Sequence, residues 1–193
     1  MSAVTCFTGA TIIAGDRFDV LQNAALNVKD GRILSIGEKI PGGQEIKLEA
    51  ALICPMFIDA HCHLGDTGAK ELGVGQPLDL VVSPPDGLKH QFLNALGREE
   101  HIAQMRHGLK EMLNNGVIAC ADFREQGIDG VRRIQAAAKE LPIHAVVFGR
   151  IGETAAAADM EAEAIELLTF ADGLGVRDVT CYPTALLQKL RLA

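Results

Sequence analysis

The sequence predicts an α/β protein with an incomplete (β/α)8 TIM-type barrel of about four βα units, preceded by a small β domain. Two observations support this prediction. From residue 56 onward, short apolar runs alternate with amphipathic helical stretches, which is typical of βαβ units and a parallel sheet. Residues 1–55 instead contain short β-like runs joined by turn residues. We therefore expect an incomplete β-sandwich-like domain over 1–55 and half of a barrel over 56–193.

Composition and charge limit the classes of protein to which the chain can belong. Its 193 residues, 48% of them hydrophobic, suffice to bury a sizeable core. The net charge is 18 − 25 = −7 and no basic run is present, so neither nucleic acid nor a membrane surface is an expected partner. Five scattered cysteines, no signal peptide and no apolar run of about 18 residues favour a cytoplasmic protein. We expect a small-molecule substrate.

Each predicted element follows from a local pattern. In the first domain, β-like runs cover residues 7–14, 25–28, 32–36 and 45–48. Asp30-Gly31 separates the second run from the third and is a hairpin signal, because glycine tolerates a positive φ. Beyond residue 56, we expect a buried strand between Pro55 and Gly65 and a long loop over 65–88 that can cover a barrel mouth. The further expected elements are helices at 98–115, 128–141, 155–173 and 183–193 and strands at 117–123, 143–149 and 176–182.

The stretch over residues 52–66 carries the clearest chemical signal. Side chains alternate between the two faces of a strand, so Phe57, Asp59, His61 and His63 share one face and Cys62 points to the other. Two imidazoles two residues apart on a rigid strand can direct nitrogens at one cation. The sequence therefore predicts His61 and His63 as metal ligands.

Residues 55–63 read Pro-Met-Phe-Ile-Asp-Ala-His-Cys-His and follow β-like segments that contain Asp-Gly-Arg-Ile at 30–33. This phrase closely resembles the opening of the metal-dependent amidohydrolase superfamily, with Met56 where the family usually has glycine. The resemblance implies hydrolysis of C–N bonds in a (β/α)8 barrel, with the His-x-His pair at the end of the first barrel strand. It also implies zinc or iron, which lowers the pKa of a bound water and supplies hydroxide. Asp59 is expected either to support the site from a second shell or to bond backbone N–H groups.

The resemblance also concerns the number of metals. Binuclear members carry a lysine in the fourth barrel strand, which becomes a carbamate that bridges two metals. The sequence over 178–182, Asp-Val-Thr-Cys-Tyr, has no lysine, and Lys189 lies further along the chain. One metal per site, as in the cytosine-deaminase-like branch, is therefore expected rather than two.

Further candidates for the substrate pocket come from position alone. His90 lies in or just after the expected long loop, which makes it a candidate for a substrate contact. Barrel active sites form at the carboxyl ends of strands, which selects Asp122, Arg124, Arg150 and Tyr182, with Glu125 next to Arg124 at the same strand end. An ordinary loop ion pair is the alternative for the charged residues. The remaining helical histidines, His101 and His107, are expected to be solvated.

The leading hypothesis is the N-terminal half of a C–N hydrolase of the deaminase-like group, acting on a small nitrogen-containing substrate. The family draws its other metal ligands from barrel strands five, six and eight, so the chain alone is expected to be inactive. One alternative is a non-catalytic half-barrel whose two open sheet edges pair in a homodimer that serves as a binding or regulatory module. Another is a binuclear hydrolase of the hydantoinase and dihydroorotase type.

Overall fold

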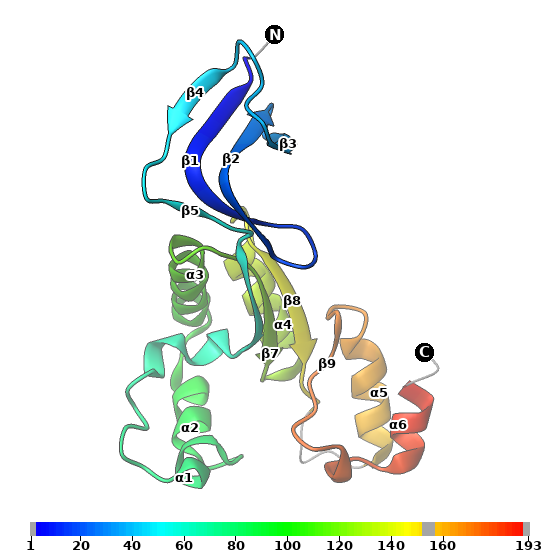
Figure 1. The fold of residues 1–193 in the computed structure, drawn as a ribbon. Coiled ribbons are helices and arrows are strands. Elements are labelled where there is room, and N and C mark those ends of the chain that lie inside the picture. Colours follow the sequence, from blue (N-terminus) through cyan, green and yellow to red (C-terminus); the bar gives the residue numbers. More distant parts are fainter. Residues whose placement is uncertain (1–2, 152–156, 191–193) are drawn as a thin grey trace. The chain divides into compact units, whose positions relative to one another are not determined.

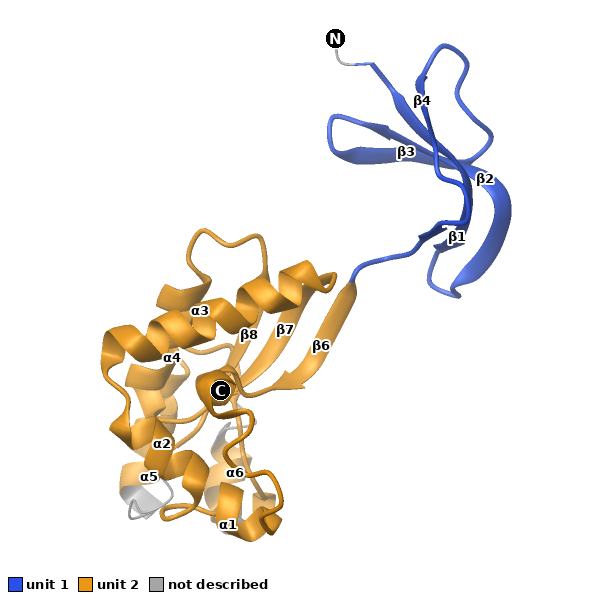
Figure 2. Ribbon diagram, turned by 90° about the vertical axis from the view of Figure 1, so that its left-hand side faces the viewer, with its two compact units in different colours: residues 1–56 blue, residues 57–193 orange. Residues whose placement is uncertain are grey.

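The structure, a computed structural model, describes residues 3–151 and 157–190. The chain forms two compact units, Met1–Met56 and Phe57–Ala193, which are coloured separately in Figure 2. Among the described residues, no helix is long and apolar enough to span a bilayer.

The first unit is a single five-stranded sheet (Figure 1). Its strands are β1 (Thr5–Ala14), β2 (Asp19–Lys29), β3 (Arg32–Gly37), β4 (Gln44–Lys47) and β5 (Leu52–Ile53). β1, β2 and β3 pair in antiparallel fashion, whereas β4 and β5 run parallel to β1. The predicted hairpin is present, because Asp30 and Gly31 have φ values of 51° and 73°, as a tight two-residue turn requires. A second layer that would make a sandwich is not among the described residues of this unit, so the sandwich stays a prediction.

The second unit is built on a four-stranded parallel sheet in the order β6-β7-β8-β9. The strands are β6 (Phe57–Cys62), β7 (Val117–Arg124), β8 (His144–Gly149) and β9 (Gly173–Leu174). The connections between the strands contain the 3-10 helix η1 (Leu64–Ala69) and the helices α1 (Leu78–Val82), α2 (Leu88–Ala95), α3 (Arg98–Asn114), α4 (Gly127–Ala138) and α5 (Ala157–Leu167). The 3-10 helix η2 (Val179–Cys181) and α6 (Thr184–Leu190) follow β9. Parallel strands joined by helices fit part of a (β/α) barrel.

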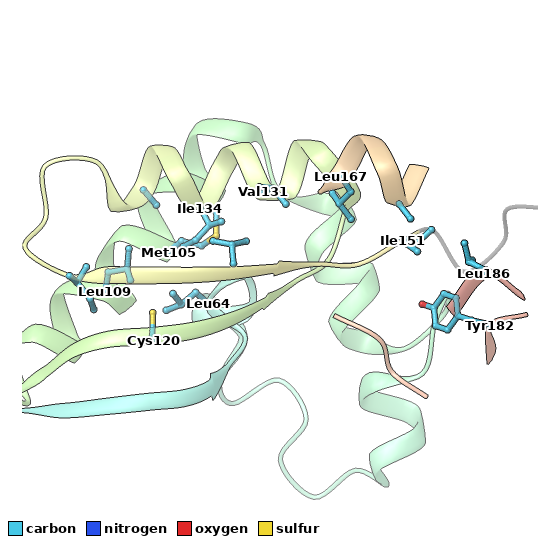
Figure 3. Close-up of a cluster of buried hydrophobic side chains, with 14 residues drawn as sticks. Leu64, Met105, Leu109, Cys120, Val131, Ile134, Ile151, Leu167, Tyr182 and Leu186 are labelled. Carbon is cyan, nitrogen blue, oxygen red and sulfur yellow. The ribbon is translucent and has the colours of Figure 1, made fainter. Parts of the chain in front are cut away.

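The core of this unit lies between the sheet and the helices α3 and α4, which run along one face of it (Figure 2). Met105, Leu109 and Ile134 are fully buried there against Cys120 (Figure 3). Each fully buried aliphatic side chain contributes about 1.5–3 kcal/mol to stability. The helices that the apolar stripes predicted are therefore held to the sheet by those stripes.

Two expectations for the strands are wrong. The strand expected to be buried is β6, which lies at an edge of the sheet and leaves Phe57 61% and Ile58 70% exposed. The fourth strand is not at 176–182; β9 pairs earlier, at Gly173–Leu174. Asp178 explains the shift, because its Oδ1 accepts hydrogen bonds from the backbone N and the Oγ1 of Thr180, each at 2.8 Å. Such local bonds compete with a sheet ladder and favour η2.

Two helical expectations also need correction. The expected loop over 65–88 contains η1 and α1, and α2 begins at its end. His101 is fully buried rather than solvated: its Nε2 is 3.0 Å from the carbonyl oxygen of Gly65 and its Nδ1 is 3.0 Å from a guanidinium nitrogen of Arg133. His101 precedes Met105 by four residues, so it lies on the apolar face of α3. Of the helix expected at 155–173, residues 155 and 156 lie outside the described residues, and α5 ends at Leu167, six residues before the expected end.

Candidate functional site

His61 and His63 come together at the carboxyl end of β6. Their Nε2 atoms are 3.3 Å apart. Two imidazole nitrogens that bind one tetrahedral zinc at about 2.05 Å are themselves separated by about 3.3 Å. The spacing of the two rings therefore fits a shared divalent cation.

The strand β7 fixes the orientation of both rings. Nδ1 of His63 is 3.0 Å from the carbonyl oxygen of Phe123 and 3.1 Å from Oε1 of Glu125. A hydrogen on Nδ1 donates to these oxygens and leaves the lone pair on Nε2, directed toward His61. The His61 ring stacks on Phe123, with centroids 4.2 Å apart and planes at 17°. Oδ1 of Asp59 accepts the backbone N–H of His61 at 3.1 Å, so this carboxylate supports the backbone that carries the pair.

The described residues supply two candidate metal ligands and no complete set. Within residues 3–151 and 157–190, no group of three or more His, Cys, Asp or Glu side chains is arranged to hold a metal ion. The ring nitrogens of His61 and His63 thus fit a cation, and a stable metal centre needs donors in addition to them.

A buried cluster of charges lies behind His63. Glu125 Oε1 is 2.8 Å from Nζ of Lys89, and Oε2 is 2.5 Å from a guanidinium nitrogen of Arg124. Lys89 also contacts Asp66 at 3.0 Å. Burial alone raises the pKa of Glu125, but His63, Arg124 and Lys89 outweigh it and hold that pKa far below its usual range. Glu125 is therefore a permanent carboxylate that orients His63.

A cavity of about 380 Å³ opens in front of the two histidines. The residues around it come from the end of β6 and η1, from α1 and α2, and from the carboxyl ends of β7, β8 and β9. They are His61, His63, Asp66, Val82, Lys89, Phe123, Arg150, Gly175, Val176 and Arg177. This position agrees with the rule that open α/β sheets bind ligands at the carboxyl ends of their strands.

The structure places the predicted substrate-pocket residues in different environments. Arg150 lines the cavity with the histidines. His90 lines a different cavity and places Nε2 3.2 Å from the carbonyl oxygen of Val82. Tyr182 is 7% exposed and belongs to the hydrophobic core. Asp122 and Arg124 are both fully buried, so neither reaches the cavity.

Strand alternation explains the burial of Asp122 and Arg124. Cys120, Asp122 and Arg124 occupy alternate positions of β7 and are the buried ones. Phe123 lies on the other face, against His61. Oδ1 of Asp122 accepts the backbone N–H of Leu64 at 2.7 Å, and Oδ2 is 3.3 Å from Arg124. These two residues therefore hold the segment after β6 in place from the helical side of the sheet.

Sequence reasoning missed three residues of the site, Lys89, Phe123 and Arg177, whereas the strand-end rule already pointed to Glu125. Phe123 has a signal in the sequence, because it alternates with the charged residues of β7. Glu125 follows that strand directly, where barrel sites form. Lys89 and Arg177 have no such signal, because only the folded chain brings them to the cavity.

Comparisons with known proteins are consistent with this geometry. The parallel sheet and the paired imidazoles at its edge define an α/β protein of the kind found in metal-dependent hydrolases. No family model matches the sequence. A protein of Methanothermobacter thermautotrophicus that carries the provisional name aminohydrolase is 35% identical over 130 residues, which cover 67% of this chain and 34% of that protein.

Solved structures share the fold. Guanine deaminase from C. acetobutylicum with bound guanine has a TM-score of 0.64 and 18% identity over 86% of this chain and 42% of its own. Atrazine chlorohydrolase TrzN from Arthrobacter aurescens TC1 complexed with zinc has a TM-score of 0.62 and 15% identity, with the same coverage. Together with the similarity to the aminohydrolase of M. thermautotrophicus, this shared fold confirms the predicted resemblance to the amidohydrolase superfamily. The chain spans about a third of the length of its curated relative.

Proposed function

We propose that this chain forms the N-terminal part of a cytoplasmic, metal-dependent hydrolase of C–N bonds that acts on a small nitrogen-containing substrate. The observation that carries the proposal is the 3.3 Å approach of the Nε2 atoms of His61 and His63 at the carboxyl edge of a parallel sheet. The sequence similarity to the provisional aminohydrolase and the fold shared with guanine deaminase support hydrolysis of a C–N bond as the reaction class.

In this proposal the residues of the chain bind a metal ion and orient the imidazole rings that hold it. His61 and His63 would hold a divalent cation, zinc or iron, which when bound lowers the pKa of a coordinated water and supplies a hydroxide nucleophile. Glu125 and the carbonyl oxygen of Phe123 keep the Nδ1 hydrogen on His63, so that Nε2 remains a ligand. Phe123 fixes the plane of His61.

We propose one metal per site. A bridging carbamate requires a lysine at the fourth strand, and β9 contains only Gly173 and Leu174. Lys189 lies in α6, where Nζ contacts both carboxylate oxygens of Glu161 at 2.9 Å. This arrangement favours a deaminase-like site over the binuclear site of a hydantoinase or dihydroorotase.

Zinc titration of the purified chain tests the ligand assignment. We expect one zinc per chain by calorimetry, with the affinity lowered more than about tenfold in His61→Ala and in His63→Ala, because loss of an outer-shell partner alone already costs about 10–100-fold. His107→Ala is the matched control, because this histidine is 70% exposed on α3. Equal zinc affinity in all four proteins would refute the assignment. Ammonia release from heterocyclic amines by the zinc-loaded chain is expected to be absent, because two protein ligands do not complete a centre.

The edge of the sheet supports a second candidate function. β6 leaves Phe57 61% and Ile58 70% exposed, and its outer side has no neighbouring strand among the described residues. Open apolar edges favour pairing with another strand. A non-catalytic homodimer predicts a concentration-dependent dimer in sedimentation equilibrium that Ile58→Lys dissociates; a monomer at all concentrations would count against it.

A further inference from the structure

The segment that follows β6 is held in place by three fully buried polar side chains. Oδ1 of Asp122 accepts the backbone N–H of Leu64 at 2.7 Å. Nε2 of His101 lies 3.0 Å from the carbonyl oxygen of Gly65, and the guanidinium of Arg124 occupies the space that a side chain at position 65 would need. Buried polar groups destabilise a fold unless they are paired, so their concentration here fixes a short backbone segment firmly.

Asp66 follows this segment directly and lies at a bend of the chain. Its backbone has φ −100° and ψ 19°, outside the helical region, where η1 is kinked. The N–H of Asp66 donates to the carbonyl oxygen of His63 at 3.4 Å. The side chain of Asp66 lines the cavity that also contains His61 and His63. The buried support therefore places this carboxylate in the same cavity as the two candidate ligands.

One oxygen of the Asp66 carboxylate is paired and the other is open to the cavity. Oδ2 lies 3.0 Å from Nζ of Lys89, whose side chain is only 9% exposed. The same Nζ is 2.8 Å from Oε1 of Glu125, so Lys89 anchors Asp66 while it shares its charge between two carboxylates. Within residues 3–151 and 157–190, no donor contacts Oδ1, and the side chain is 30% exposed. Oδ1 can therefore accept a hydrogen bond from a ligand.

The other charged groups around the cavity cannot take this role. The basic side chains that line it donate hydrogen bonds and accept none; they are Lys89, Arg150 and Arg177. Glu125 lies behind His63 with its side chain 6% exposed, and both of its oxygens already contact basic groups. Among the described residues around this cavity, Asp66 is the one that presents a carboxylate oxygen to a ligand.

We propose that Asp66 is a specificity-determining residue whose Oδ1 accepts a hydrogen bond from an N–H group of the substrate, while the reacting carbon faces His61 and His63. This inference rests on the proposed function and assigns a recognition residue to the same site. A hydrogen bond to a charged acceptor is about twice as strong as one between neutral groups. A site built to bond an N–H group discriminates strongly against an analogue that lacks it, because the acceptor then stays unpaired.

Binding of matched probes to the zinc-free chain tests the inference. The probes are 2-aminopyrimidine and 4-aminopyrimidine, each compared with its methyl analogue, 2-methylpyrimidine or 4-methylpyrimidine, by calorimetry or ligand-observed NMR. An amino and a methyl group have nearly the same size, so each pair differs mainly in the N–H donor. We expect at least one amine to bind roughly fivefold or more tightly than its methyl analogue. Because no metal is present, this outcome is independent of the zinc titration that tests the proposed function.

Variants assign the preference to one residue. Asp66→Ala should remove the preference for the amine, and Asp66→Asn should weaken it, because an amide oxygen accepts without charge. A role of Asp66 in stability alone would change the affinity of amine and methyl probe equally. Asp79→Ala is the matched control, because Asp79 is an exposed aspartate of α1 that does not line the cavity. This variant should keep the preference of the unmodified chain.

NMR of the unmodified chain supplies a second measurement that does not depend on the folding of a variant. In a chain labelled with carbon-13 at its aspartates, the Cγ resonance of Asp66 should shift on addition of the preferred amine and stay in place with the methyl analogue. Equal or absent binding of the amines and their analogues at millimolar concentration would overturn the inference. An unchanged preference in folded Asp66→Ala, or a Cγ resonance that does not respond to the amine, would also overturn it.

Discussion

Arg124 is expected to be a structural residue whose loss costs much of the stability of the second unit. Its fully buried guanidinium contacts Asp122 at 3.3 Å and Glu125 at 2.5 Å. Removal of one partner of a buried ion pair costs about 3–5 kcal/mol, because the remaining charge is buried without compensation. Glu125 retains Lys89 at 2.8 Å, so we expect the lower end, about 3 kcal/mol, for Arg124→Met.

Urea unfolding followed by circular dichroism measures this cost. With a slope of about 2 kcal/mol/M, a loss of about 3 kcal/mol lowers the midpoint by roughly 1.5 M. The double variant D122N/R124M should recover about 1–2 kcal/mol, because asparagine still accepts the Leu64 N–H and leaves no bare charge. Arg17→Met is the exposed control, expected within about 0.5 kcal/mol of the unmodified chain. A cost below about 1 kcal/mol for Arg124→Met would refute the role as a buried counterion and restore Arg124 as a candidate for substrate contact.

Two further predictions concern the packing around this arginine. Gly65→Ala should destabilise the chain by about 1–3 kcal/mol, because the added Cβ would lie 2.1 Å from Nη2 of the buried Arg124. Gly97→Ala is the control, because a Cβ at position 97 would have no atom within 4 Å. Equal urea midpoints of the two variants would contradict the expected clash. Burial, together with Arg124 and Arg133, lowers the pKa of His101, so the unfolded chain binds more protons and stability should fall as the pH drops through about 6.5. His101→Gln can keep both hydrogen bonds and should reduce this loss between about pH 7.5 and 5.5; an unchanged pH dependence of the urea midpoint would count against the assignment.

The elements with a strong local pattern were predictable from the sequence. The apolar stripe of α3 and the Asn-Gly stop after it place that helix within one residue of its observed end at Asn114. The hairpin at Asp30-Gly31 needed only the backbone freedom of glycine. In these segments the local preference and the tertiary packing agree, so neither overrides the other.

The position of the fourth strand was not predictable from the local sequence pattern. Residues 176–182 are apolar enough for a strand, but the Asp178 side chain bonds Thr180 and a two-residue strand forms at Gly173–Leu174 instead. The glycine that was expected to end a helix begins that strand, because a Cβ at position 173 would lie 2.8 Å from the ring of Phe148. A helix stop and a close approach between strands both favour glycine, and the sequence alone does not distinguish them.

The candidate site was also predictable only in part from the sequence. The motif identified the two candidate ligands, since His61 and His63 lie two residues apart at the end of β6, but their orientation depends on β7, about 60 residues away in the chain. Selection of charged residues at strand ends favoured Asp122 and Arg124, whereas alternation along β7 turns both toward the helices and Phe123 toward the histidines. In a parallel sheet covered by helices on one face, the position of a residue along its strand therefore shows whether it lies at the edge where a site forms. The alternation of side chains between the two faces then decides which of these residues reach the site. When both criteria are applied, Phe123 is predicted in the site and Asp122 and Arg124 are predicted to support it from the buried face of β7. Neither criterion selects Lys89 or Arg177, because only the folded chain brings these two residues to the cavity.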